Sequence, residues 1–199
     1  MTAIIDYKAG NLTSVKLAFA ALGVETIVTS DPKAIAAADR VVFPGVGAAR
    51  SAMENLRSLG LVDAVKNAAA TKPFLGICLG MQILFDHSEE DGGVDCLGII
   101  PGRVRRFPSV PGFKVPEIGW NGVEGNGEWG TGNEGTGTKE FYFVHSYYAE
   151  VVPETAGVTE YAGVKFTAMV KKRRLWSCQF HPEKSGRIGL ELIKEWLSC

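Results

Sequence analysis

A cysteine between two glycines is the first feature of this sequence that could do chemistry. In Gly76-Ile77-Cys78-Leu79-Gly80 the cysteine ends a short apolar run, and a helical pattern begins directly after it. Glycines on both sides allow the sharp strand-to-helix turn of a nucleophile elbow. A helix N-terminus favours the thiolate form of a cysteine, and the N–H of Leu79 would be free to bind an oxyanion. The glycine pattern alone fits a nucleophile and a buried packing cysteine equally well.

A cysteine nucleophile needs a base, and the chain contains three histidines. His181 follows the apolar run LWSCQF, which is typical of a strand, and Glu183 lies two residues further on. Residues two apart at a strand end lean to the same side, so Glu183 can accept the N–H of the ring nitrogen that faces away from the thiol. Together with Cys78, these residues form a candidate Cys-His-Glu triad.

The other two histidines fit the role of base less well. A helix is predicted over LGMQILFDH, which would place His87 about 13 Å from Cys78 along the helix axis. We therefore expect His87 to lie at a solvated helix end. His145 lies inside the aromatic run FYFVHSYY, where we expect a histidine of the core or of the wall of a site.

Strand and helix patterns alternate over the first 90 residues, and the expected strands are TAIIDY, VETIVTS, DRVVFPG and PFLGIC. Asn11 can cap the helix LTSVKLAFAAL, and Asp31-Pro32 can begin a second helix. Further helices are predicted around ARSAMENLRSL and LVDAVKNAAA. The first helix is expected to bury an apolar face made of Val15, Leu17, Ala18 and Leu22. This alternation predicts an α/β fold with a central, mostly parallel sheet flanked by helices, and a site at the carboxyl ends of its strands.

The second half of the chain is predicted to be β-rich, from Val94 to Phe180, with strands at GRVRRF, FYFVHSYYAEV, GVKFTAMV and LWSCQF. Eight of the 24 glycines lie between Gly119 and Gly137, so we expect that stretch to be a mobile surface loop. The final run SGRIGLELIKEWL is typical of an amphipathic helix that buries Ile188, Leu192, Ile193 and Trp196. No break in composition divides the chain, so one domain is predicted over residues 1–199.

Composition excludes several classes of function. The 21 basic and 22 acidic residues give a net charge of −1, which offers no electrostatic reason to expect nucleic acid or an anionic membrane as a partner. The N-terminal residues lack the pattern of a secretory signal, and no apolar run is long enough to span a membrane. The four cysteines are scattered without the close pairs of a zinc site, and we expect them to stay reduced in the cytoplasm.

Two motifs, GICLGMQ and QFHPEKSG, together resemble the class I glutamine amidotransferases, the Cys-His-Glu glutaminases. Six further motifs resemble one branch of that family, the glutaminase subunits of imidazole glycerol phosphate synthase in histidine biosynthesis. These motifs are DYKAGNLTSV, FPGVGA, MQILFDHSEE, LGIIPGRVRRF, VPEIGWN and YFVHSYY. They follow one another over nearly the whole chain, and the resemblance implies the flavodoxin-like fold of that family.

The resemblance also implies the role of each residue. Cys78 would attack the side-chain amide of glutamine, His181 would act as base and then as acid, and Glu183 would orient His181. The oxyanion would be held by the N–H of Leu79 and by a backbone N–H at Val46 or Gly47. The residues that the resemblance assigns to substrate binding are Gly45, Val46, Gly47, Leu79, Gln82, Ser146 and Tyr147. No metal or organic cofactor is implied.

The partner that the resemblance implies is the cyclase subunit of imidazole glycerol phosphate synthase, a (β/α)₈ barrel that would receive ammonia in a heterodimer. Its products would be imidazole glycerol phosphate and an aminoimidazole carboxamide ribonucleotide. The surface facing the cyclase would include Asn11, Trp120-Asn121 and Tyr147. Two departures from the family pattern stand out: Glu117 replaces a common histidine in VPEIGWN, and the Gly-rich stretch after Asn121 replaces a short apolar segment.

Two alternatives remain open from the sequence. The first is a glutaminase that supplies ammonia to another acceptor; GNL, GWN and FVHSYY disfavour pyridoxal phosphate or anthranilate synthesis but not a paralogue. The second is a non-catalytic subunit that keeps the fold. The presence of Cys78, His181 and Glu183 argues against a non-catalytic subunit, because such a protein has no need of all three.

Overall fold

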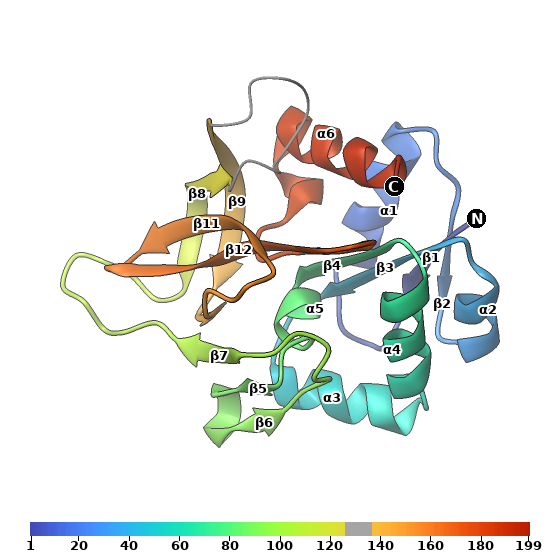
Figure 1. The fold of residues 1–199 in the computed structure, drawn as a ribbon, viewed down its shortest axis with the longest axis horizontal. Coiled ribbons are helices and arrows are strands. Elements are labelled where there is room, and N and C mark those ends of the chain that lie inside the picture. Colours follow the sequence, from blue (N-terminus) through green and yellow to red (C-terminus); the bar gives the residue numbers. More distant parts are fainter. Residues whose placement is uncertain (126–136) are drawn as a thin grey trace.

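A parallel sheet forms the centre of one half of the molecule. The computed structural model describes residues 1–125 and 137–199, and it places this α/β half beside a β-rich half (Figure 1). The parallel strands lie in the order β2-β1-β3-β4-β13. They are β1 (Thr2–Ile5), β2 (Thr26–Thr29), β3 (Arg40–Gly45), β4 (Phe74–Cys78) and β13 (Leu175–Cys178). Every residue of β1, β4 and β13 is buried, which explains why these segments are mostly apolar in the sequence.

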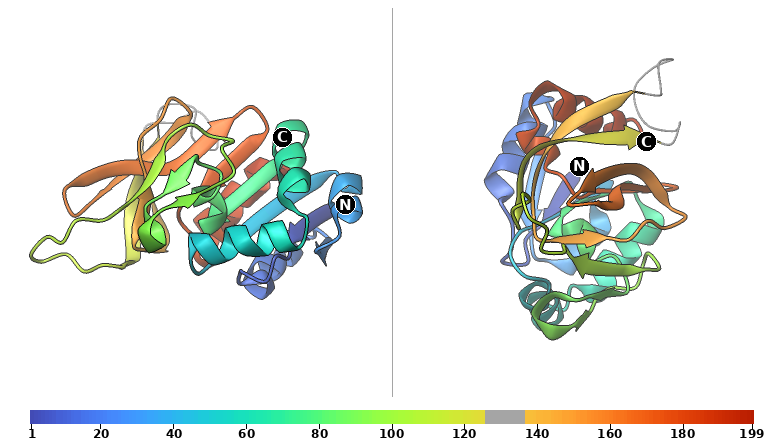
Figure 2. Two further views of the ribbon diagram at one scale, coloured as in Figure 1. Left: turned by 90° about the horizontal axis from the view of Figure 1, so that it is seen from below. Right: turned by 90° about the vertical axis from the view of Figure 1, so that its left-hand side faces the viewer.

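Helices cover both faces of this parallel sheet, as the sequence predicts (Figures 1 and 2). Helices α1 (Leu12–Ala21) and α6 (Gly186–Leu197) pack on one face, where the rings of Phe19 and Trp196 meet edge to face with centroids 6.0 Å apart. The opposite face is covered by α2 (Pro32–Ala37), α3 (Ala49–Ser58) and α4 (Val62–Thr71). Within the described residues, no helix has the length and apolar character needed to cross a membrane.

The first two helices begin at the capping residues that the sequence indicates. The side chain of Asn11 accepts a hydrogen bond from the N–H of Ser14 at 3.3 Å, and Asp31 accepts one from Lys33 at 2.9 Å. Pro32 occupies the first position of α2, where its missing N–H costs nothing. These contacts confirm the predicted starts of both helices.

The apolar face predicted for α1 was wrong at one position. Leu17 is 64% exposed, whereas Val15, Ala18 and Phe19 are buried. At 100° per residue, Leu17 lies on the side of the helix opposite Val15 and Phe19, so it cannot share their contact with the sheet.

The β-rich half continues from β13 through antiparallel pairing and then divides at β12 (Val164–Lys172). One branch runs through β10 (Tyr147–Ala149) and β7 (Arg103–Arg106) to β5 (His87–Ser88) and β6 (Val94–Asp95). The other runs through β11 (Thr155–Tyr161) and β8 (Glu117–Gly125) to β9 (Thr138–His145). Figure 2 shows these strands projecting away from the helices of the α/β half. The predicted β-rich second half is confirmed, although FYFVHSYYAEV forms two strands that meet at Ser146.

The Gly-rich stretch was predicted to be a loop, and this prediction was wrong for residues 119–125. Those residues belong to β8, which pairs with β9 in an antiparallel register from Glu117↔His145 to Glu124↔Thr138. Glycine has a low preference for strands, but backbone pairing with the long aromatic strand β9 holds these residues in a strand. Residues 126–136 of the predicted loop lie outside the described residues. Strand β11 was also missed by the sequence analysis.

The helix after Cys78 is much shorter than predicted. Helix α5 covers only Leu79–Gln82, and the following Ile83, Leu84 and Phe85 are completely buried. Three consecutive apolar residues cannot all face the core from one helix that is polar on its other side, so the chain leaves the helix there. The N–H of Asp86 then bonds to the carbonyl of Gly102 at 3.1 Å, and His87 begins strand β5. The prediction that His87 ends a helix was therefore wrong.

Candidate functional site

Cys78 lies on a strained turn between β4 and α5. Its backbone has φ 55° and ψ −115°, a conformation that costs a non-glycine residue on the order of 1–3 kcal/mol. Gly80 makes the turn possible, because a Cβ atom there would lie 1.9 Å from the carbonyl oxygen of Phe43 in the neighbouring strand β3. The predicted elbow is confirmed as a local structure, and it presents the thiol at the carboxyl end of the parallel sheet.

His181 and Glu183 lie at the same end of the sheet because β13 pairs with β4 in parallel, with Cys178 opposite Ile77. His181 follows β13 by three residues and is buried, and Pro182–Lys184 form a single turn of 3₁₀ helix. The His181 Nδ1 and the Glu183 Oε1 are 2.8 Å apart, and both side chains are almost completely buried. The other ring nitrogen is not used by Glu183, and His181 lines the same cavity as Cys78.

The environment of His181 favours its charged form. Burial by itself lowers the pKa of the imidazole, but hydrogen bonds to Cys78 and Glu183 and the charges of both outweigh this and raise the pKa to about 10. The ring can therefore take a proton from the thiol and hold it at neutral pH. A histidine that lies beside a cysteine and is hydrogen-bonded to a carboxylate is the arrangement expected of a thiol hydrolase.

A cavity of about 300 Å³ opens beside the thiol. Cys78 and His181 both line it, together with six of the seven residues that the family resemblance assigns to substrate binding. Those six are Val46, Gly47, Leu79, Gln82, Ser146 and Tyr147. Leu79 is the first residue of α5, so its N–H has no partner within the helix.

The seventh residue, Gly45, lies behind the cavity and does not line it. A Cβ atom at this position would be 2.2 Å from the hydroxyl oxygen of Tyr7 and 2.9 Å from the backbone nitrogen of Gly80. Gly45 therefore allows Tyr7 and the elbow to pack closely. Tyr7 is fully buried, which raises the pKa of its phenol far above the usual range, with the nearby Cys78 adding to the effect.

Glu90 also lines the cavity, and the sequence analysis did not single it out. It belongs to a turn of 3₁₀ helix, Glu90–Gly92, and its Oε2 accepts a hydrogen bond of 2.6 Å from the N–H of Ala49 at the start of α3. Burial raises the pKa of its carboxyl group. In the sequence Glu90 is one of several acidic residues in a row, which is typical of a solvated segment, so only its presence in the motif MQILFDHSEE could have indicated it.

The two remaining histidines behave differently from each other. His145 is buried, lines the cavity and packs against Phe107, Phe143 and Phe166, so it belongs to both the core and the wall of the site. His87 does not line the cavity, and its Nδ1 lies 3.0 Å from the Oδ1 of Asp95 on β6. Among residues 1–125 and 137–199, no group of three or more His, Cys, Asp and Glu side chains is arranged to hold a metal ion.

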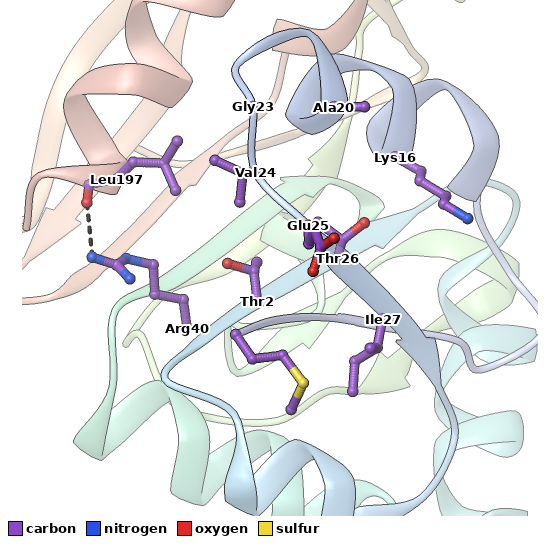
Figure 3. Close-up of a pocket in the computed structure, with 11 residues that line it drawn as sticks. Thr2, Lys16, Ala20, Gly23, Val24, Glu25, Thr26, Ile27, Arg40 and Leu197 are labelled. Atoms are coloured by element: carbon purple, nitrogen blue, oxygen red, sulfur yellow. Dashed lines mark hydrogen bonds between the residues drawn. The ribbon is translucent and has the colours of Figure 1, made fainter.

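A second cavity, of about 1080 Å³, lies at the opposite ends of the parallel strands (Figure 3). Thr2, Thr26 and Arg40 line it at the starts of β1, β2 and β3, and Arg40 donates a hydrogen bond to the carbonyl of Leu197 at 2.9 Å. Its described lining contains no cysteine or histidine. The larger cavity therefore lacks the thiol and imidazole groups that line the smaller one.

Comparison with solved structures supports the assignment of the fold. A structure described as a glutamine amidotransferase superposes with a TM-score of 0.74 at 17% identity, covering 98% of this chain and 97% of the other. The PurLQS structure from Thermotoga maritima gives a TM-score of 0.73 at 15% identity, covering 99% and 97%. At these identities the likeness concerns the fold, and it confirms the predicted class I glutamine amidotransferase architecture.

Comparison of sequences identifies the family. Residues 3–197 match the family described as Glutamine amidotransferase class-I. A protein of Herpetosiphon aurantiacus named imidazole glycerol phosphate synthase subunit HisH is 46% identical over 200 residues, covering 99% of this chain and 93% of that protein. The protein of the same name from Moorella thermoacetica is 47% identical, covering 98% and 92%. The chain is therefore a class I glutamine amidotransferase, and it belongs to the family of HisH subunits of imidazole glycerol phosphate synthase.

Proposed function

We propose that this protein hydrolyses glutamine to glutamate and ammonia with Cys78 as the nucleophile, His181 as base and acid, and Glu183 as the residue that orients His181. The single observation that carries the proposal is the position of Cys78. It lies on a strained elbow and lines a cavity together with a histidine whose Nδ1 is 2.8 Å from a buried carboxylate.

In the first half of the reaction, His181 takes the thiol proton and the sulfur attacks the carbonyl carbon of the glutamine side chain. The carbonyl oxygen becomes an oxyanion, for which the N–H of Leu79 and a backbone N–H at Val46 or Gly47 are the proposed donors. His181 then returns the proton to the amide nitrogen. The C–N bond breaks, ammonia leaves and a γ-glutamyl thioester remains on Cys78.

In the second half, a water molecule takes the place of ammonia. His181 removes a proton from this water, and the oxygen attacks the thioester carbonyl. Collapse of the second tetrahedral intermediate breaks the C–S bond, releases glutamate and returns the proton to the sulfur. Glu183 keeps the same ring nitrogen directed at the reacting atoms in both halves.

The cavity wall suits the α-amino group of glutamine. The Nε2 of Gln82 donates to the carbonyl of Tyr147 and to the Oε1 of Gln179, so the carbonyl oxygen of Gln82 is the group left to accept from a ligand. This acceptor and the carboxylate of Glu90 fit an ammonium group, and the backbone at Ser146 and Tyr147 completes the proposed contact.

The ammonia acceptor that we propose is a cyclase subunit with a (β/α)₈-barrel fold. The two subunits would form a heterodimer, in which the whole of the present chain acts as one glutaminase domain. The cyclase would use ammonia to make imidazole glycerol phosphate and an aminoimidazole carboxamide ribonucleotide in histidine biosynthesis. The names of the relatives support this pathway, and Trp120, which is 55% exposed on β8, supports a protein partner at that surface. Four unpaired cysteines fit a reducing, cytoplasmic location.

The proposed pathway predicts that the cyclase subunit of the same organism activates this glutaminase. We expect glutamate release to rise when the cyclase and its nucleotide ligand are both present, because coupling prevents ammonia from being wasted. The measurement is glutamate formation with the cyclase alone, with its ligand, and with neither. Glutamine turnover that is indifferent to the cyclase and its ligand would point instead to a paralogue serving another acceptor.

A further inference from the structure

Glu117 and His145 form a buried pair that the proposed reaction does not use. The Oε2 of Glu117 and the Nε2 of His145 are 2.9 Å apart, and the two side chains are only 4% and 3% exposed. They face each other across the first rung of the β8–β9 pairing, against the aromatic rings that surround His145. Taking such a pair out of water is costly, so its placement beside the cavity suggests a role other than stability.

The partners of His145 fix both its tautomer and its orientation. Its Nδ1 is 2.7 Å from the carbonyl oxygen of Tyr147, which can only accept, so Nδ1 carries a hydrogen. One further proton must lie between Nε2 and the Glu117 carboxyl group to make the 2.9 Å contact a hydrogen bond. Both ring nitrogens are therefore occupied, and Glu117 holds the ring so that Nδ1 points at the Tyr147 carbonyl.

The Tyr147 carbonyl in turn orients two amide side chains that lead to the nucleophile. It accepts a hydrogen bond of 2.7 Å from the Nε2 of Gln82, whose other N–H donates to the Oε1 of Gln179 at 2.8 Å. Because the backbone carbonyl of Tyr147 can only accept a hydrogen bond, the amide of Gln82 cannot rotate by 180° without losing this bond. Gln179 is then held with its Nε2 directed at the sulfur of Cys78, 3.8 Å away.

Glu117, the other member of the pair, is the first residue of strand β8, which is partly exposed at the surface. The Oε1 of Glu117 accepts a hydrogen bond of 2.8 Å from the Nδ2 of Asn121, which also donates to the carbonyl of Glu160 at 3.0 Å. Between these two residues, Ile118 and Trp120 are 63% and 55% exposed. Glu117 therefore joins an exposed strand to the interior of the site.

We propose that Glu117 and His145 are positioning residues of the glutaminase site, because they fix the Tyr147 carbonyl and through it the amides of Gln82 and Gln179. This inference rests on the proposed glutaminase function. It assigns no chemical step to either residue. Their effect falls on glutamine binding, since Gln82 lines the cavity and presents its carbonyl oxygen there only while its N–H groups are held by Tyr147 and Gln179. We call the Glu117–His145 pair the anchor. Its glutamate is a feature of this chain, because the family motif commonly has histidine at position 117.

The test compares three proteins in complex with the cyclase: wild type, Glu117→Ala and Glu117→Gln. Glutamine at position 117 can accept from Asn121 and donate to the Nε2 of His145, so it keeps the ring in place, whereas alanine cannot. Losing the anchor is expected to raise KM for glutamine about 10-fold or more in Glu117→Ala, with a smaller change in kcat. In Glu117→Gln, KM for glutamine is expected to stay within about threefold of the wild-type value. On a logarithmic scale this is less than half of the change of about 10-fold expected for Glu117→Ala.

A second matched pair separates the two bonds of His145 in the Glu117→Gln background. Asparagine at position 145 can place its amide nitrogen near the position of Nδ1 and keep the bond to Tyr147. Glutamine at position 145 reaches toward position 117 and loses the bond to Tyr147. We expect KM to stay close to the Glu117→Gln value in His145→Asn and to rise above it in His145→Gln.

The outcomes are distinguishable. A purely structural role would lower the melting temperature and the active fraction of these variants while leaving KM unchanged, and that result would overturn the inference. Equal KM values for Glu117→Ala and wild type, with glutamate release still dependent on Cys78, would overturn it and leave the proposed function intact. Wild-type protein that released no glutamate through Cys78 would overturn both.

Discussion

Replacing Cys78 with alanine is expected to reduce kcat for glutamate release by roughly 10⁴- to 10⁶-fold, the range found when a covalent nucleophile is removed. The loss follows because no thioester can form without the sulfur, although the cavity and the His181–Glu183 pair remain. Melting temperature should change little, since the contacts of the thiol with Val144 and Gln179 are weak, at 3.8 Å each. The measurement is steady-state glutamate formation in the complex with the cyclase.

The other cysteines provide matched controls for Cys78. Cys96 and Cys199 do not line the cavity beside His181, so Cys96→Ala and Cys199→Ala should keep wild-type kcat and KM. Cys178 is completely buried, and burial raises the pKa of its thiol well above the usual range, with Glu183 adding to the effect. It is therefore held as a neutral thiol that cannot replace Cys78. Substantial turnover in Cys78→Ala would show that another group attacks glutamine.

Replacing Glu183 with glutamine is expected to lower kcat by roughly 10²- to 10⁴-fold and to change its pH dependence. Glu183 is one of the two hydrogen-bond partners that raise the pKa of His181 to about 10. In the wild type, His181 is protonated below that pH and can supply the proton that ammonia needs, so activity should fall as pH rises through about 10. Removing the carboxylate charge lowers the pKa of His181, and the alkaline limb of kcat should move to lower pH.

The pH profile separates this role from a structural one. A Glu183→Gln protein that was merely less stable would lose amplitude at every pH and keep the alkaline limb in place. Glu191→Gln is a suitable control, because Glu191 lies on the surface of α6, where it pairs with Arg187 at 3.7 Å. Its profile should match the wild type. An alkaline limb that does not move in Glu183→Gln would contradict the assigned role of Glu183.

The parallel half of the fold could be predicted from the sequence because its signals are local. Buried strands are continuous apolar runs, and capping residues such as Asn11 and Asp31 mark the helix starts within a few residues. The elbow at Cys78 could also be predicted, because the glycines that allow it, Gly76 and Gly80, lie close to Cys78 in the sequence. Helix α5 was harder, because its early end depends on the burial of Ile83, Leu84 and Phe85 by segments distant in the chain.

The parts of the site that were missed depend on contacts between distant segments. Strand β8 is rich in glycine, and only its register with β9 shows that it is a strand. The same register brings Glu117 opposite His145, which neither residue's neighbours in the sequence could indicate. Glu90 reaches the cavity because its carboxylate accepts the N–H of Ala49 at the start of α3, 41 residues away. The proposed triad residues, in contrast, lie at the end of a recognisable strand or within a few residues after one.

The most direct test of the central claim is covalent labelling with a glutamine analogue that carries an electrophilic diazoketone in place of the side-chain amide. We expect one label per chain, located on Cys78 by peptide mass spectrometry, with labelling slowed by excess glutamine and by His181→Ala. This result would show that the Cys78 thiol is the group that attacks a ligand bound as glutamine is bound. Labelling on Cys96 or Cys199, or labelling of Cys78 that glutamine does not slow, would contradict the account.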